Sequence, residues 1–292
     1  MIKVVYQDNI TQSYYIDLSN RKFQREENKT LEKLFNEKFK DEFSCSLSDL
    51  LYGSFEELQV IKERLGNMSD REDVKALFNY ETKFQTPISK FFEKQVEVHV
   101  CYFCNIEYIN KFTTQDERVK NGFTLDHFIG KSDYPYLALS LYNLIPSCYT
   151  CNSPKVKGTN EVNTLSPTST VFDFDKKVKF KTFMQNENLQ IEAEEDFSLL
   201  LKEDFSDIYD RYIEVFELNG RYEYHKTKVI EMINKRKEYP DSRIKELAKL
   251  TEKTEKEVKQ DLFGEYLFEK DDLHKRPLSK LTRDISKELG LL

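Results

Sequence analysis

Apolar residues recur at helical spacing through the first third of the chain. Ser54 and Glu57 stand three residues apart ahead of a further apolar stripe, which is the capping-box pattern of a helix start. These features predict a mainly helical region over residues 28–95. Residues 1–20 mix β-branched and aromatic side chains around a Gln-Asp-Asn turn, which is typical of a hairpin. The clearest early apolar positions are Leu31, Leu34, Phe35 and Phe39.

The second half of the chain passes from a strand pattern to a helical one. Residues 172–183 alternate apolar and polar side chains, which predicts a strand or hairpin. From Arg221 onward the helical spacing returns, with a second capping box at Thr254 and Glu257. We divide the chain into four regions: 1–95, mainly helical; 96–160, with paired cysteines; 161–220, with short strands; and 221–292, helical.

Charge limits the classes of function. The chain has 45 Lys and Arg against 52 Asp and Glu, a net charge of −7. This balance argues against a protein that coats nucleic acid through a strong cationic field. The acidity is concentrated in 161–220, whereas 97–160 is neutral. Because no stretch approaches 18 apolar residues and the N-terminus lacks an apolar signal region, we expect a cytoplasmic protein without membrane association.

Four of the five cysteines form two C-x-x-C pairs, Cys101/Cys104 and Cys148/Cys151. Each pair can place two thiolates on one tetrahedral Zn²⁺, so together they predict a closed, structural zinc site. The redox interpretation is weaker, since neither pair has βαβ surroundings. Cys45 stands alone and is expected to be a buried apolar residue.

Polar residues between the two cysteine pairs carry the candidate chemistry. Asp126 and His127 are adjacent after an apolar lead-in, and neighbours on a strand point to opposite faces. Asn143 lies in an apolar stretch, where a buried amide needs hydrogen-bond partners. Asn152 directly follows Cys151, where a zinc knuckle often passes into a helix, so a helix-capping role competes with metal binding.

At these residues the sequence resembles HNH (ββα-metal) endonucleases, in the branch stabilised by a four-cysteine zinc. The placement of Asp-His between the knuckles is similar to phage endonucleases that resolve DNA junctions. The sequence segments LDHFIGKSDYP and NLIPSCYTCNSPK are more similar to those of bacterial HNH proteins encoded beside an ABC- or SMC-type ATPase in anti-phage systems. The resemblance is strongest over 101–158, weaker to about 285, and does not extend to residues 1–95.

The resemblance implies a role for each polar residue. His127 would be the general base that activates water, and Asp126 and Asn152 would hold one Mg²⁺ or Mn²⁺. Asn143 would hold the hairpin loop and the base in place. The sequence departs from many relatives at Asn152, where they have His, and this favours an oxygen-bound cation. It also has Gly130 where many have Pro, which costs loop rigidity.

Basic and aromatic residues flank this segment. Lys131, Lys155 and Lys157 are candidates for phosphate contacts, although such lysines are more often simply solvated. The nearby tyrosines could stack on unpaired bases, but tyrosines of this kind more often belong to the core. They are Tyr134, Tyr136 and Tyr142.

The sequence thus predicts an α+β, mainly α, protein with a small zinc-stabilised ββα-metal (HNH) core between helical regions. The predicted function is metal-dependent hydrolysis of phosphodiester bonds in DNA, with RNA as the other substrate class. The resemblance implies an anti-phage defence effector that acts with an ABC/SMC-like ATPase partner. The alternative is a zinc-stabilised nucleic-acid-binding or adaptor module that does not cleave. An acidic chain is expected to bind DNA poorly on its own.

Overall fold

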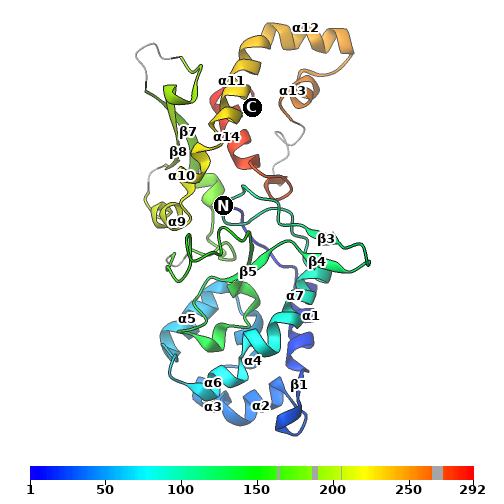
Figure 1. Cartoon of the computed structure of the whole chain (residues 1–292), viewed down its shortest axis with the longest axis vertical. Coiled ribbons are helices and arrows are strands. Elements are labelled where there is room, and N and C mark those ends of the chain that lie inside the picture. Colours follow the sequence, from blue (N-terminus) through cyan, green and yellow to red (C-terminus); the bar gives the residue numbers. More distant parts are fainter. Residues whose placement is uncertain (163–164, 186–189, 205, 265–271) are drawn as a thin grey trace. The chain divides into compact units, whose positions relative to one another are not determined.

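The structure is a computed structural model of the chain, shown in Figure 1. It describes residues 1–162, 165–185, 190–204, 206–264 and 272–292. About half of this part is helical, and its strands form two-stranded antiparallel sheets. The expected α+β class, mainly α, is confirmed.

The described chain divides into two compact units. One comprises residues 3–103 and 108–172, and we call it the N-terminal unit. The other comprises residues 1–2, 104–107 and 173–292, and we call it the C-terminal unit.

Short helices make up most of the N-terminal unit before the cysteines. Ser54 accepts a hydrogen bond from the Glu57 backbone N–H while the Glu57 carboxylate accepts one from the Ser54 backbone N–H, so the predicted capping box is confirmed. The same device starts the preceding helix at Ser46 and Asp49. The helices are α1 (Asp8–Ser19), α2 (Leu31–Lys38), α3 (Lys40–Phe43), α4 (Leu47–Tyr52), α5 (Phe55–Leu65), α6 (Glu72–Leu77) and α7 (Gln85–Gln95), with a π-helical turn at Tyr80–Phe84.

The hairpin expected over residues 1–20 is wrong, because residues 8–19 form α1. Tyr14 and Leu18 lie one helical turn apart and are fully buried. The Tyr14 hydroxyl also donates a hydrogen bond of 2.7 Å to the Leu139 carbonyl. Burial of one helical face therefore outweighs the β-propensity of the aromatic and β-branched residues, which is a weak preference that depends on packing.

The strands of the N-terminal unit pair as three antiparallel ladders. In the ladder that matters for the site, β5 (Thr124–His127) pairs with β6 (Leu144–Ser147), so that Asp126 faces Ile145 across the ladder. All of β6 is buried, which fixes β5 on the interior of the unit. The other strands are β1 (Lys22–Phe23), β2 (Lys29–Thr30), β3 (Lys111–Thr113) and β4 (Val119–Asn121).

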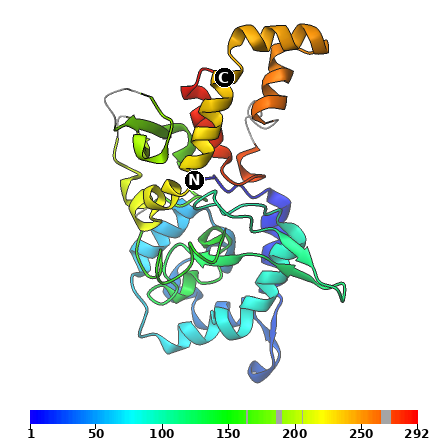
Figure 2. The same cartoon turned by 45° about the horizontal axis from the view of Figure 1, so that its top comes forward.

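The C-terminal unit contains one longer hairpin and a set of helices. The alternating segment forms β7 (Val178–Met184), which pairs with β8 (Phe197–Glu203), and the helical pattern after Arg221 is likewise confirmed. Figure 2 shows α14 (red) alongside α11 (gold). The helices are α8 (Phe174–Lys177), α9 (Asp210–Val215), α10 (Leu218–Glu223), α11 (Lys226–Glu238), α12 (Asp241–Thr251), α13 (Glu255–Phe263) and α14 (Ser279–Glu288).

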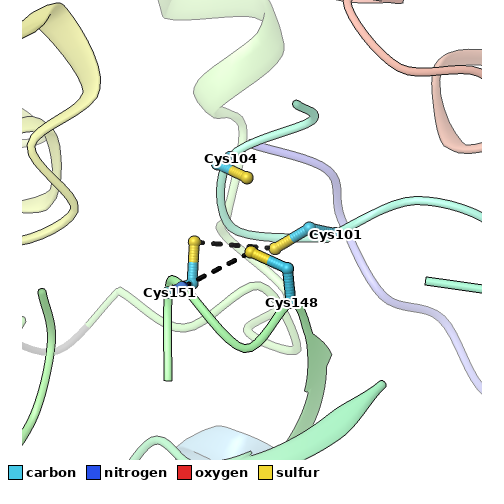
Figure 3. A group of neighbouring side chains, drawn as sticks. All are labelled: Cys101, Cys104, Cys148 and Cys151. Carbon is cyan, nitrogen blue, oxygen red and sulfur yellow. Dashed lines mark hydrogen bonds between the residues drawn. The ribbon is translucent and has the colours of Figure 1, made fainter. Parts of the chain in front are cut away.

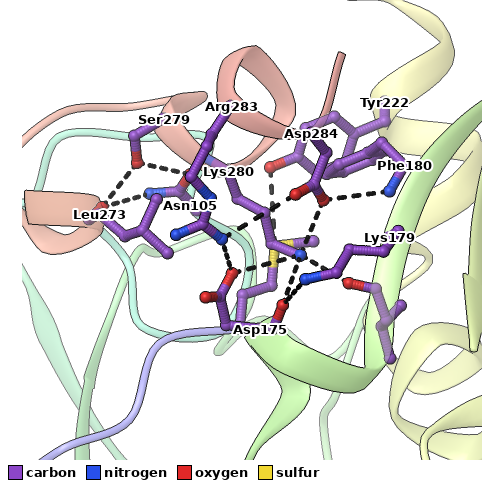
Figure 4. A network of polar contacts seen from close by, with 12 residues as sticks. Asn105, Asp175, Lys179, Phe180, Tyr222, Leu273, Ser279, Lys280, Arg283 and Asp284 are labelled. Atoms are coloured by element: carbon purple, nitrogen blue, oxygen red, sulfur yellow. Dashed lines mark hydrogen bonds and ion pairs between the residues drawn. The ribbon is translucent and has the colours of Figure 1, made fainter. Parts of the chain in front are cut away.

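A buried polar network attaches α14 to β7 (Figure 4). The Lys280 ammonium is 2.8 Å from Asp284 Oδ2 and 2.6 Å from the Val178 carbonyl. Asp284 Oδ2 also accepts a hydrogen bond of 3.1 Å from the Phe180 N–H. The start of α14 is held by Asn105, whose Oδ1 accepts from the Lys280 backbone N–H at 3.1 Å. Residues 279–286 of α14 are all buried, although only Leu281 and Ile285 among them are apolar.

None of the helices in the described ranges combines the length and the apolar character that crossing a membrane requires.

Candidate active site and metal centre

The four paired cysteines come together in a buried cluster (Figure 3). Their sulfur atoms all lie within 4.8 Å of one another. Cys101 Sγ is 3.7 Å from Cys151 Sγ, far beyond the length of about 2.05 Å of a disulfide bond. Four sulfurs placed about 2.3 Å from one tetrahedral Zn²⁺ lie about 3.8 Å apart. The cluster can therefore hold a metal ion such as zinc, as the cysteine spacing predicts.

Backbone amides within each knuckle point at the sulfurs. The N–H of Cys151 donates to Cys148 Sγ and that of Ile106 donates to Cys104 Sγ, both at 3.4 Å. Asn105 makes the tight turn after Cys104 possible, because its φ of 56° lies in the left-handed region that Asn tolerates. Hydrogen bonds to a thiolate favour its charged, metal-binding form.

Adjacent positions on β5 give Asp126 and His127 different partners. Asp126 contacts the ammonium of Lys157, whereas His127 contacts the Ala138 carbonyl and the ring of Tyr80. This is the consequence of strand geometry, in which neighbouring side chains leave on opposite sides. Both side chains are buried.

His127 is held as a neutral imidazole. Its Nε2 lies 2.9 Å from the Ala138 carbonyl oxygen, and because a carbonyl can only accept, Nε2 carries the proton and Nδ1 is the basic nitrogen. Tyr80 packs edge-on against the ring, with the ring centroids 4.5 Å apart. Burial, followed by the positive charge of Lys131, lowers the pKa of His127 to about 3. The imidazole is therefore uncharged at neutral pH, and its burial disfavours the protonated form.

Asp126 is paired with Lys157 inside the protein. The Lys157 ammonium lies 3.1 Å from both carboxylate oxygens, and the two side chains are only 4% and 5% exposed. Burial raises the pKa of Asp126 more than the neighbouring Lys157 lowers it. Only Oδ1 receives a hydrogen bond, since Oδ2 is within ion-pair distance but lacks hydrogen-bond geometry.

Oδ2 of Asp126, which accepts no hydrogen bond, is suited to bind a hard cation. A buried carboxylate oxygen that accepts no hydrogen bond retains a lone pair for a ligand. Asn152, the second expected ligand, lines the same cavity and offers an amide oxygen. Carboxylate and amide oxygens are donors that Mg²⁺ and Mn²⁺ accept. The residues fit such a cation, and its binding stays a prediction.

The cavity beside these residues has a volume of about 560 Å³. Its wall is formed by β5, by the loop after β5 and by the turns after Cys151, and it is bounded on another side by the start of α7. It therefore brings Asp126, His127 and Asn152, which are up to 26 positions apart in the sequence, to the wall of one cavity.

The segment after Cys151 differs from expectation. Residues 151–159 form consecutive turns, so the helix expected to begin near Asn152 is absent from this segment and Asn152 does not cap it. Pro154 disfavours a helical conformation at the preceding Ser153, and Gly158 has a φ of 49°, outside the helical region. The Asn152 N–H donates a hydrogen bond of 3.2 Å to the Cys148 carbonyl, which connects this residue to the cysteine turn.

Asn143 is fully buried and uses both ends of its amide. Its Oδ1 accepts from the Ile129 N–H at 2.6 Å, and its Nδ2 donates to the Ile129 and Leu137 carbonyls at 3.1 and 3.0 Å. These bonds close the loop that connects β5 to β6. The loop includes Ala138, the residue whose carbonyl contacts His127 Nε2. A role of Asn143 in catalysis stays a prediction.

The three candidate lysines have different surroundings. Lys157 is buried against Asp126, as described above. Lys131 lines the cavity and lies 3.3 Å from Glu81 Oε1. Lys155 is exposed. Phosphate contact remains a prediction for each of them.

The tyrosines proposed for base stacking are partly core residues. Tyr136 is buried, with its hydroxyl donating to the Gly66 carbonyl at 2.8 Å. Tyr142 packs edge-on against Tyr6. Tyr134 is half-buried under the ammonium of Lys62.

Several residues of the cavity were missed by reasoning from sequence. Glu81, Gln85 and Ser89 come from the helical region 1–95, to which no role was assigned. Their polar side chains recur every four residues, which also describes any solvated helix face, so the pattern carried no distinctive signal. Tyr149 also lines the cavity and is 66% exposed. Its position between two zinc-type cysteines was a usable signal for a residue near the site.

Comparisons of the chain with protein-family models, with curated proteins and with solved structures find no match.

Proposed function

We propose that this protein is a metal-dependent endonuclease of the HNH type that hydrolyses phosphodiester bonds in DNA. The observation that carries the proposal is the state of His127: its Nε2 is engaged by the Ala138 carbonyl, its Nδ1 is the basic nitrogen, and the residue borders a cavity that it shares with Asp126 and Asn152. A purely structural histidine would not be expected to share a cavity with a carboxylate and an amide that can bind a cation.

Hydrolysis of a phosphodiester requires a base for the attacking water. A neutral imidazole with a free basic nitrogen accepts a proton from water, and the bond from Nε2 to the Ala138 carbonyl stabilises the imidazolium that results. Asn143 keeps the loop carrying that carbonyl in place. Together these residues hold the base in one tautomer and one orientation.

Asp126 and Asn152 would hold one Mg²⁺ or Mn²⁺ at the cavity. When bound, such a cation neutralises charge on the phosphate and stabilises the leaving oxygen. The four-cysteine cluster would hold a structural zinc that keeps the turn with Asn152 next to β6. The resemblance noted above supports the wider role, an anti-phage effector acting with an ABC/SMC-like ATPase.

A nicking assay tests the proposal. Supercoiled plasmid, single-stranded DNA and RNA are incubated with the zinc-loaded protein in Mg²⁺, in Mn²⁺ or in a chelator that leaves the zinc bound. His127→Ala should lower the metal-dependent rate by about 10²- to 10⁴-fold, the usual contribution of a general base. His225→Ala, a histidine of the C-terminal unit, is the matched control and should cleave like the native chain.

Two results would count against this function. Cleavage that is indifferent to metal and to His127→Ala would point to a contaminant. Binding of nucleic acid without cleavage, also in the presence of the co-expressed ATPase, would favour the zinc-stabilised binding or adaptor module instead.

A further inference from the structure

Lys157 is placed where an internal cation contacts three oxygen atoms. Its Nζ lies 3.1 Å from each carboxylate oxygen of Asp126 and 3.1 Å from the His127 carbonyl oxygen. The Lys157 side chain is 5% exposed. Lys155, two residues earlier in the same turns, is exposed and serves as a comparison.

The oxygen atoms that contact Lys157 are of the kind that also bind metal ions. Oxygen atoms of carboxylates and carbonyls are the ligands of hard cations, and two of the three around Nζ belong to Asp126, the proposed cation ligand. Asp126 supplies one negative charge, which the ammonium already balances, and the Asn152 amide is neutral. The residues assigned to the site therefore offer a divalent cation no net negative charge while Lys157 is in place.

We infer that Lys157 is an internal counter-cation that competes with the divalent cation for Asp126. The cation then binds the protein alone weakly and is held firmly only together with a phosphate of the nucleic acid, which supplies the missing negative charge. This inference rests on the proposed function and adds the condition under which the cation is bound. In the protein without nucleic acid, Lys157 therefore positions Asp126. It is not assigned the phosphate contact that the sequence predicts.

A purely structural role is the competing explanation. The Lys157 backbone N–H donates to the Cys151 carbonyl at 3.3 Å, so this residue also belongs to the cysteine turn. A structural lysine predicts that its replacement changes stability but leaves the affinity for a cation unaltered. Competition predicts that a neutral side chain of similar length increases that affinity.

Mn²⁺ binding separates the two explanations. Free Mn²⁺ is followed by electron paramagnetic resonance as it is titrated into the zinc-loaded full chain without nucleic acid. Lys157→Met should bind Mn²⁺ at least ten-fold more tightly than the native chain, whereas Lys155→Met should bind like it. Adding Asp126→Asn to Lys157→Met should abolish the gain. Equal affinities of the native chain and Lys157→Met would overturn the inference.

A second measurement needs no substitution at Lys157. In the His127→Ala background, in which cleavage should be slow, a DNA oligonucleotide should tighten Asp126-dependent Mn²⁺ binding at least ten-fold. Tight Asp126-dependent binding without DNA would refute only the competition by Lys157. Absence of any Asp126-dependent binding, with or without DNA, would instead refute the cation site and with it the proposed function.

Discussion

Two buried lysine–aspartate pairs, one in each unit, have contrasting surroundings. Asp126 and Lys157 are 4% and 5% exposed, and Asp284 and Lys280 are 1% and 0% exposed. Each aspartate has one oxygen without a hydrogen bond. An unsatisfied buried oxygen therefore does not by itself identify a functional site. The first pair lines the cavity described above, together with His127 and Asn152.

The second pair is part of a larger set of charges. Lys280 and Arg283 both contact Asp175, and together they outweigh the effect of burial, so the pKa of Asp175 is lowered. In the first pair burial dominates over Lys157, and the pKa of Asp126 is raised. The network of the C-terminal unit is thus held by several cations, whereas Asp126 has one close ammonium partner that another cation could replace.

The largest effect should follow removal of zinc, which tests whether both pairs depend on the cysteines. The Lys157 N–H is bonded to the Cys151 carbonyl, and Asn105, next to Cys104, is bonded to the Lys280 N–H. Structural zinc contributes directly to folding. We expect a strong chelator, or Cys148→Ser, to lower the melting temperature by more than about 10 °C, equivalent to several kcal/mol at this size. An unchanged melting curve in zinc-free protein would contradict a structural metal.

Breaking the pair of the C-terminal unit should have the next largest effect. Lys280→Met removes the cation nearest to the buried carboxylate of Asp284 and leaves only Arg283 at 3.9 Å. Breaking a buried pair costs about 3–5 kcal/mol in comparable sites. Urea denaturation measures this loss. The double variant Lys280→Met/Asp284→Leu removes both charges and should recover most of it. A double variant as unstable as the single one would mean that packing, not charge, is responsible.

The same substitution at the cavity should cost less. In Lys157→Met, water in the adjoining cavity can hydrate Asp126, so we expect a loss of about 1–2 kcal/mol, the scale of one unsatisfied polar group. The exposed Lys155→Met should remain within about 0.5 kcal/mol of the native chain. If Lys157→Met were as destabilising as Lys280→Met, the contrast between the two pairs would disappear.

The sequence predicted the features that depend on local chemistry. The capping boxes at Ser54 and Thr254 were recognised because they involve residues only three positions apart. The cysteine cluster was recognised because each C-x-x-C pair sets most of its own geometry within a single turn.

Features that depend on long-range packing were not predictable in the same way. The segment around Lys157 reads as a polar loop, and only the folded chain places its ammonium against Asp126. Glu81 and Gln85 reach the cavity through the packing of α7 and the π-helical turn before it. The helical state of residues 8–19 was missed because burial of Tyr14 and Leu18 overrides local propensity.

The smallest effect concerns the response of the C-terminal network to acid. Since the pKa of Asp175 lies below its ordinary value of 3.8, its pairing contributes stability above pH 3.8 that is lost as the pH falls through the lowered pKa. Asp175→Asn should therefore be less stable than the native chain at pH 7, and this difference should shrink as the pH falls below 3.8.

Denaturation at several pH values measures this difference. Asp207→Asn, an exposed carboxyl in the same unit, is the control and should follow the native chain throughout. The difference between Asp175→Asn and the native chain could instead stay constant from neutral to acid pH. Asp175 would then act through hydrogen bonds that an amide cannot replace, and not through its charge. In that case the network around Lys280 would not be held by an excess of cations, and the contrast with Asp126 would rest on the cavity alone.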